Sequence, residues 1–143
     1  MAWMAFFAPA QISASGMAAE RLRMEVTAAN IANAYTTRTP DGTPYRRRDV
    51  VFAALLDQGR DLYGLRVGGV RVQDIIEDRT PFQRVYNPGH PDADATGYVL
   101  MPNVNVPLEM VNLLTASRAY EANVKVLRAF RQMIEQAIQI ARG

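Results

Sequence analysis

The chain has 143 residues, of which 49% are hydrophobic and 21% charged, and its 16 basic and 14 acidic side chains leave a net charge of only +2. This composition is typical of one globular domain, or of a small domain with helical extensions, and not of a disordered chain. Because acids and arginines are interleaved, the charge pattern does not favour a nucleic-acid surface. Cysteine is absent, which excludes disulfides, thiolate catalysis and cysteine metal sites.

The first ten residues are apolar but lack the basic region that opens a signal peptide. A helical pattern follows them directly, so we expect no cleavable signal peptide. No apolar run approaches the length of about 18 residues that a membrane-spanning helix needs.

Residues 11–34 are predicted to form the first helix. Small and apolar residues recur there every three or four positions, as in a coiled-coil seam: Ile12, Ser15, Ala19, Leu22, Val26, Ala29 and Asn33. A neighbouring stripe contains Met17, Met24, Ala28 and Ile31, and a helix that is apolar on two sides requires more than one neighbour. Asn30 and Asn33 lie near the end of the helix, where asparagine tolerates a left-handed exit conformation.

The middle segment, residues 35–105, changes to an alternating pattern that is typical of strands. We predict a turn at Pro40–Gly42, a strand over residues 45–52 and a second strand over residues 65–72. The second strand loses its alternation at Gly68–Gly69, which suggests a β-bulge. Residues 78–82 are predicted to turn, residues 86–92 to form a loop, and residues 98–101 to form a short strand.

The last third of the chain predicts one uninterrupted helix over residues 107–142, about 50 Å long. Its apolar residues share one face: Met110, Leu113, Leu114, Tyr120, Val124, Leu127, Phe130, Ile134 and Ile138. Asn105 is the predicted N-cap, and Glu109 in the first turn complements the helix dipole. Asn112, Ser117 and Asn123 lie among the apolar residues, where they either fix the register of a partner helix or face water.

The candidate catalytic groups are few. His90 is the single histidine, and Asp92 and Asp94 could orient it, but no second metal ligand accompanies it. The pair Glu77–Asp78 has no nearby nucleophile. We interpret both groups as loop structure and predict no catalytic residue, cofactor, metal or small-molecule substrate; an enzyme that uses His90 is the rival hypothesis.

Two further motifs have structural interpretations. The glycines at positions 64, 68 and 69 are not followed by the helix and lysine of a phosphate-binding loop. The run Arg46–Arg48 lies in a predicted strand and could touch nucleic acid or anionic lipid. A solvated or acid-paired sheet edge is the favoured interpretation.

Several motifs resemble the bacterial flagellar rod and hook proteins. The segments Ile12–Met17 and Ala28–Asn33, followed by Thr36–Thr37, are similar to the N-terminal signature of this family. Four later segments resemble its proximal-rod members more narrowly: Asp78–Phe82, Tyr86–Asp94, Met101–Asn105 and Ala116–Asn123. The resemblance covers nearly the whole chain in order.

The resemblance implies an α+β fold in which the long N- and C-terminal helices pair as a coiled-coil-like inner domain, residues 1–34 with 106–143. Residues 35–105 would form a small β-rich outer domain. It also implies a structural subunit of the flagellar basal body that the type III export apparatus secretes into the periplasm without a cleaved signal peptide. Its partners would be other copies of itself, other rod proteins and the membrane-embedded base, in a drive shaft that surrounds the export channel.

The helical patterns predict a set of residues at the subunit interface: Ile12, Leu22, Val26, Asn30, Ile31, Asn33, Met110, Leu113, Tyr120, Asn123, Val124 and Leu127. Two alternatives stay open. The helices could form a hairpin that packs on its own domain, or the chain could be a stand-alone helical adaptor that binds another protein without polymerising.

Overall fold

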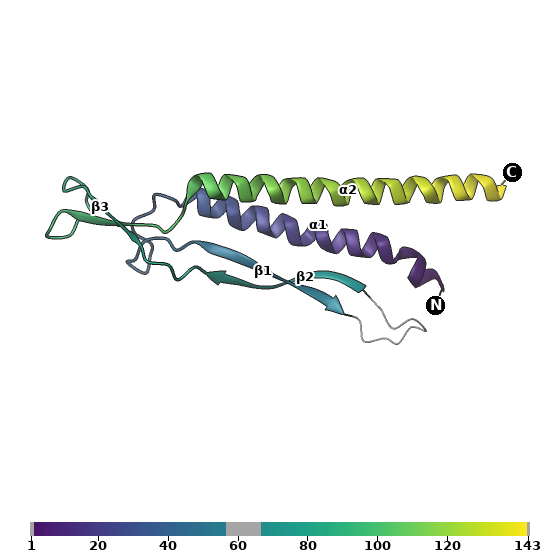
Figure 1. Ribbon diagram of the computed structural model, residues 1–143, viewed down its shortest axis with the longest axis horizontal. Helices are drawn as coiled ribbons and strands as arrows, with labels where there is room; N and C mark the ends of the chain where they lie inside the picture. The colour runs from purple at the N-terminus through teal and green to yellow at the C-terminus, as the bar shows by residue number, and fades with distance from the viewer. Residues whose placement is uncertain (1, 57–66, 143) are drawn as a thin grey trace. The chain divides into compact units, whose positions relative to one another are not determined.

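The computed structural model describes residues 2–56 and 67–142, and Figure 1 shows two long helices with two small sheets between them in the sequence. The elements are α1 (Ala2–Ala32), β1 (Arg48–Leu56), β2 (Val67–Glu77), β3 (Gln83–Tyr86), β4 (Tyr98–Met101) and α2 (Val106–Arg142). Strand β1 pairs with β2, and β3 pairs with β4. The predicted α+β class is confirmed. Neither helix, over its described residues, is long and apolar enough to cross a membrane.

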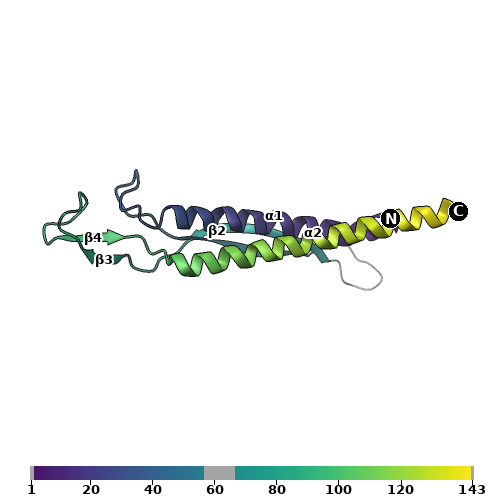
Figure 2. The ribbon, with the colours of Figure 1, turned by 90° about the horizontal axis from the view of Figure 1, so that it is seen from above.

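The chain divides into two compact units, each with segments of both helices. The first unit contains Met1–Leu22, Val51–Asp74 and Thr115–Gly143, and the second contains Arg23–Val50 and Ile75–Leu114. In each unit the segments of α1 and α2 lie side by side (Figure 1 and Figure 2). The predicted division into a helical inner domain and a β-rich outer domain stays a prediction.

In the first unit the helices approach closely through small residues. Ala19 and Ala116 are buried, and a side chain added at Gly16 would lie 3.1 Å from the Asn123 amide nitrogen. Phe7 packs edge-on against Phe130, with ring centroids 6.1 Å apart. Since an early residue of α1 contacts a late residue of α2, the two helices run antiparallel.

Strand β2 meets α1 at Gly69 in the first unit. The Ser15 hydroxyl donates to the Ile12 carbonyl (2.7 Å) and accepts from the Val70 amide (3.0 Å). Gly69 has φ +104°, and a Cβ atom there would overlap the Ser15 hydroxyl. The interrupted alternation at Gly68–Gly69 therefore marks the place where strand and helix touch, and the bulge stays a prediction.

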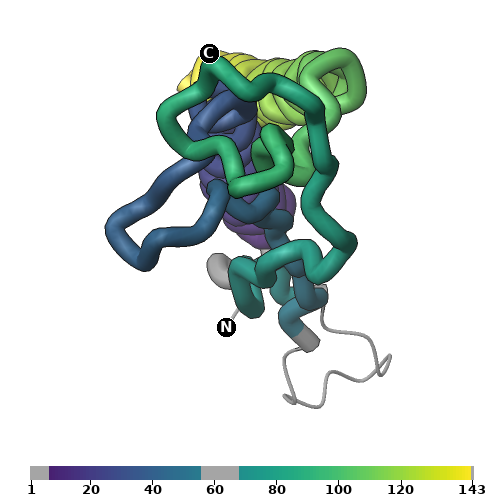
Figure 3. The backbone as a smooth tube through the Cα atoms, turned by 90° about the vertical axis from the view of Figure 1, so that its left-hand side faces the viewer, coloured from purple at the N-terminus to yellow at the C-terminus, as the bar shows by residue number. Residues whose placement is uncertain are grey.

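In the second unit, β3 and β4 form an antiparallel hairpin with Tyr86 opposite Tyr98. Figure 3 views the backbone from this end of the ribbon in Figure 1, with the hairpin in teal and green. Val99 is buried on one face of the hairpin, and the two tyrosine rings pack edge-on on the other, with centroids 5.2 Å apart. The connection consists of turns, as predicted, and the Asn87 amide donates to the Gly97 carbonyl (2.9 Å). The alternating pattern did not indicate β3, whose residues are all exposed.

The helix boundaries differ partly from the predictions. Asn105 caps α2 as predicted, since its side-chain oxygen accepts from the Leu108 amide (3.1 Å). Helix α1 begins much earlier than residue 11 and continues through Pro9. The predicted left-handed exit at Asn30 or Asn33 is wrong, because no described residue other than glycine has a positive φ. The Asn33 side chain instead donates to the Ala29 carbonyl (2.9 Å) within the final turn.

The strand boundaries also shift. Strand β1 begins at Arg48 rather than at residue 45, because Tyr45 and Arg47 belong to a hydrogen-bonded cluster that precedes the strand. Strand β2 extends to Glu77. Of the predicted strand over residues 65–72, the first two positions lie outside the described residues, as does the glycine at position 64.

Candidate assembly surface

Asn30 is the centre of a buried hydrogen-bonded cluster in the second unit. Its side chain is 1% exposed. The amide nitrogen donates to the Arg48 carbonyl (2.8 Å) and to Glu109 Oε2 (2.9 Å). The amide oxygen accepts from the Tyr45 hydroxyl (3.0 Å) and from the Arg48 amide (2.9 Å). Both donors and both acceptor positions of the side chain are therefore used.

Glu109 is the charged member of this cluster. Its side chain is 1% exposed, and Oε1 lies 2.7 Å from Arg47 Nε. Asn112, one turn later, donates to the same oxygen (3.3 Å). Burial alone would lower the pKa of Arg47, but its hydrogen bond to Glu109 and the nearby negative charge raise it overall. For Tyr45, in contrast, burial is itself the main cause of the raised pKa.

A second asparagine, Asn103, holds the neighbouring backbone. Its amide oxygen accepts from the Arg47 amide (2.8 Å), and its amide nitrogen donates to the carbonyls of Asp78 (3.0 Å) and Thr80 (3.2 Å). Asn30 and Asn103 thus bind the amides of consecutive residues, Arg47 and Arg48. Together they join the ends of both helices to the segments that flank β1 and β2.

The arginine run lies at this cluster. Arg47 and Arg48 pair with acids, which agrees with the favoured interpretation, but only Arg48 lies in a strand and Arg46 binds carbonyls. The Arg46 guanidinium donates to the Asp78 carbonyl (3.1 Å) and lies 4.3 Å from the centre of the Phe82 ring. Arg48 lies 3.5 Å from Glu77 in an ion pair. The cluster was only partly foreseeable, because the sequence pattern assigned Glu109 to the helix dipole and Asn30 to the helix exit.

The side of α2 that faces the rest of the chain is buried or half-buried at every third or fourth position. Its members are Glu109, Leu113, Ala116, Tyr120, Val124, Leu127, Phe130 and Ile134. All the predicted interface residues except Met110 are likewise buried or half-buried within the chain. Asn112, Ser117 and Asn123 are half-buried on this side too. Contact of these residues with other copies stays a prediction.

A second, exposed side of α2 forms what we call the outer stripe. Its members are exposed, uncharged and mostly three or four positions apart: Leu108, Val111, Thr115, Ala122, Val126, Ala129, Met133, Ala137 and Ile140. The exception is the interval between Thr115 and Ala122, where the exposed Arg118 has this spacing. Leu114 is exposed at the edge of this stripe, whereas Met110 is exposed on another side of the helix, about 200° from Leu108. Burying a leucine, valine or methionine side chain completely contributes about 1.5–3 kcal/mol. Because the large side chains of the stripe are mostly 48–59% exposed, the single chain leaves about half of that stabilisation unused.

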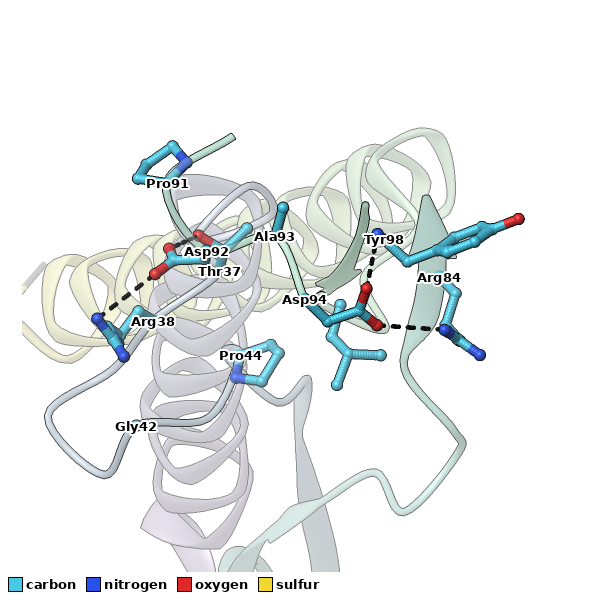
Figure 4. A pocket seen from close by; sticks show the side chains of 11 residues that line it. Thr37, Arg38, Gly42, Pro44, Arg84, Pro91, Asp92, Ala93, Asp94 and Tyr98 are labelled. Atoms are coloured by element: carbon cyan, nitrogen blue, oxygen red, sulfur yellow. Dashed lines mark hydrogen bonds and ion pairs between the residues drawn. The ribbon is translucent and has the colours of Figure 1, made fainter. Parts of the chain in front are cut away.

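The loop residues that follow His90, including Asp92 and Asp94, line the pocket shown in Figure 4. This pocket of about 450 Å³ lies between the loop after α1 and the β3–β4 connection. Asp92 accepts from the Thr37 hydroxyl (2.7 Å) and pairs with Arg38 (3.6 Å). His90 Nδ1 accepts from the Asp92 amide (3.0 Å) and so supports the turn.

Asp94, beside the same pocket, is saturated by its own loop. Its carboxylate accepts from the Thr96 hydroxyl (2.5 Å), the Tyr98 amide (3.0 Å) and Arg84 (3.3 Å). These contacts, with the Thr96 hydrogen bond first, lower its pKa to about 2. Such a carboxylate is a structural anchor and a poor proton acceptor. Within the described residues, no group of three potential ligands could hold a metal ion.

Comparison with known proteins gives one consistent result. A family model described as flagella basal body rod protein matches residues 11–38, and one described as flagellar basal body rod FlgEFG protein C-terminal matches residues 95–140. Proteins named flagellar basal-body rod protein FlgC are similar over nearly their whole length. The Borreliella burgdorferi protein is 41% identical, covering 98% of this chain and 100% of the relative. The Escherichia coli O6:H1 protein is 46% identical (90% and 92%), and the Bacillus subtilis protein 39% identical (97% and 100%).

Proposed function

Because the chain belongs to the FlgC family of flagellar basal-body rod proteins, we propose that it is a structural subunit of the proximal rod. Its terminal helices associate with those of other copies and of other rod proteins. The resulting shaft transmits torque and surrounds the export channel. The observation that carries this proposal is the outer stripe, a long apolar face of α2 that its own chain leaves exposed.

The occupant that we propose for the outer stripe is a helix of a neighbouring copy. The stripe has the spacing of a helix-packing seam, and its alanines at positions 122, 129 and 137 permit a close approach. An apolar contact surface that only Arg118 interrupts suits another apolar helix better than a polar partner. The helical parts, residues 1–34 and 106–143, would then form the inner domain, and residues 35–105 the outer one.

To transmit torque, a subunit must pass a shear force on one helix or strand to the helices and strands packed against it. In the second unit, side-chain hydrogen bonds from Asn30 and Asn103 connect both helix ends to the strand segments. Hydrogen bonds are directional and resist sliding in a way that apolar contacts do not. This chemistry supports a load-bearing role and gives no support to catalysis, so we propose that the protein is not an enzyme.

The proposed route to the rod is supported by the likeness to flagellar rod proteins. We propose that the flagellar type III export apparatus delivers the chain to the periplasm without removing a signal peptide. In the basal body it would contact the membrane-embedded base as well as the other rod proteins. The alternative, a stand-alone helical adaptor, predicts a purified protein that stays monomeric or dimeric, whereas a rod subunit should form larger assemblies. Sedimentation at increasing concentration separates the two.

Two neighbouring valines on α2 test the proposal. Val126 belongs to the outer stripe and is 48% exposed, whereas Val124 is half-buried against its own chain. We expect Val126→Asp to keep the helical content and the unfolding midpoint of the wild type but to fail to assemble or to restore motility in cells that lack the native protein. We expect Val124→Asp to lose stability as well. The exposed residue between them provides the control, Lys125→Ala, which should assemble.

A Val126→Asp protein that is incorporated into basal bodies and supports normal swimming would contradict the proposed surface.

A further inference from the structure

The first turns of α2 bury their one charged side chain and expose most of their apolar side chains, although Val106 and Leu113 are half-buried. Glu109 is 1% exposed, whereas Leu108, Met110 and Val111 are 53%, 57% and 59% exposed, and Leu114 is 54% exposed. An amphipathic helix ordinarily does the opposite, with its acids in water and its apolar arc in the core. Apolar burial within these turns, limited to the half-buried Val106 and Leu113, does not by itself explain why Glu109 is the most buried residue of the segment.

The partners of Glu109 do explain it. Its two carboxylate oxygens accept from Arg47 (2.7 Å) and Asn30 (2.9 Å), and Asn112 adds a third contact. Hydrogen bonds to the Tyr45 hydroxyl and the Arg48 backbone hold the Asn30 side chain in one orientation. The amide hydrogen that Asn30 donates to Glu109 therefore has one fixed position. The carboxylate reaches both partners in a single rotation of the helix. A buried charge without partners is costly, so other rotations are strongly disfavoured.

We infer that Glu109 is a positioning residue that fixes the rotation of the first two turns of α2, so that Leu108, Met110 and Val111 remain available to a neighbouring subunit. The role of the three exposed residues in subunit contact rests on the proposed function. The fixed rotation of the helix rests only on the hydrogen bonds of Glu109. The competing explanation is that the half-buried apolar residues farther along α2 set the rotation, and that Glu109 only occupies the space left for it.

Methionine oxidation distinguishes these explanations, because Met110 and Met133 lie on the same helix with nearly equal exposure, 57% and 59%. Dilute hydrogen peroxide converts an exposed thioether to the sulfoxide, and mass spectrometry follows each site. On the full-length monomer at low concentration, the two residues should oxidise at similar rates. In Glu109→Ala the first turns are free to bury apolar side chains, and Met110 should react about five-fold more slowly relative to Met133.

Two further variants complete the comparison. Glu109→Gln keeps the shape of the side chain and one accepting oxygen, so the Met110 to Met133 ratio should stay close to that of the wild type. Glu121→Ala removes an exposed acid from the same helix and should leave the ratio unchanged. If Glu109→Ala also keeps the wild-type ratio, the rotation is set by packing farther along α2 and the inference is wrong.

Unfolding of the variant is recognised from Met24 and Met101, which are half-buried in the second unit and would then react as fast as Met133. If Glu109→Ala unfolds, the same oxidation ratio is measured in Glu109→Leu, which keeps approximately the volume of the Glu109 side chain and removes its charge. A slower Met110 supports the inference, and an unchanged ratio overturns it. Because the measurement uses the monomer, it stands even if the wild type proves unable to assemble, a result that would count against the proposed function alone.

Discussion

The two units hold the same pair of helices by different chemistry. In the first unit α1 and α2 meet through Ala19, Ala116, the Gly16–Asn123 approach and the packed rings of Phe7 and Phe130. In the second unit the contact is polar, and its centre is a saturated asparagine bound to a buried glutamate. Apolar contacts between small residues bring helices close but tolerate sliding, whereas a buried polar pair is satisfied at one register only.

The difference suggests a division of labour within one helix pair. The polar cluster sets the register and rotation of the helices in the second unit. The small-residue contacts of the first unit add close packing. In both units the outer stripe of α2 remains exposed, and we propose that neighbouring subunits cover it. Substitutions in the two units should therefore differ in how strongly they affect folding.

The largest expected effect is the loss of Asn30. Asn30→Ala removes the hydrogen bonds of Asn30 to Glu109 Oε2, to the Arg48 amide and carbonyl and to the Tyr45 hydroxyl, and we expect it to lower the free energy of unfolding by about 3 kcal/mol. Urea denaturation followed by circular dichroism measures this. Asn33→Ala is the control, because Asn33 lies three residues away and donates only to its own helix; it should cost less than about 1 kcal/mol. Equal losses in the two variants would show that the cluster does not govern folding.

Gly69→Ala is the corresponding test of the first unit. At φ +104° an alanine is strained, and its Cβ would also overlap the Ser15 hydroxyl, so we expect a loss of about 2–3 kcal/mol. Gly42→Ala is the control for the backbone strain alone, since Gly42 has φ +76° and nothing lies within 4 Å of an added Cβ. This variant should lose about 1 kcal/mol of stability. A Gly69→Ala protein as stable as Gly42→Ala would mean that the contact between β2 and α1 is loose.

The smallest effect concerns Asp94, in a loop of the second unit away from the cluster. Its pKa of about 2 lies below the ordinary value of 3.8, so its ionised form favours the folded loop above about pH 4, and this contribution disappears as the pH falls toward 2. The side-chain carboxyl should titrate near pH 2 by NMR. Removing the largest cause of the shift, in Thr96→Ala, should raise the pKa toward its ordinary value. An unchanged pKa in this variant would assign the shift to the remaining contacts.

The elements whose residues follow a regular pattern could be predicted from the sequence. Three- and four-residue spacing indicated both helices, turn residues indicated the loops, and Asn105 indicated the start of α2. Long-range polar contacts could not be predicted in this way. Nothing near Glu109 in the sequence shows that Arg47, 62 residues away, is its partner. Strand β3 was missed because its exposed residues have no alternation of buried and exposed positions.

The outer stripe was also not separated from the inner side of α2. Leu114 and Ile138 were grouped with Leu113 and Tyr120, although the structure exposes the first two. A helix with apolar residues on two sides gives overlapping periodic patterns, and one sequence does not say which side the chain itself will cover.

The central claim is that the outer stripe of α2 is exposed in the free chain and covered in the assembled rod. Oxidation of Met133, the methionine of the outer stripe, measured in the monomer and in purified basal bodies, tests it directly. Met133 should react readily in the monomer and at least about ten-fold more slowly in the rod, where buried side chains are shielded from the oxidant. If Met133 reacts equally fast in the two states, neighbouring subunits do not cover this face of the helix and the account is contradicted.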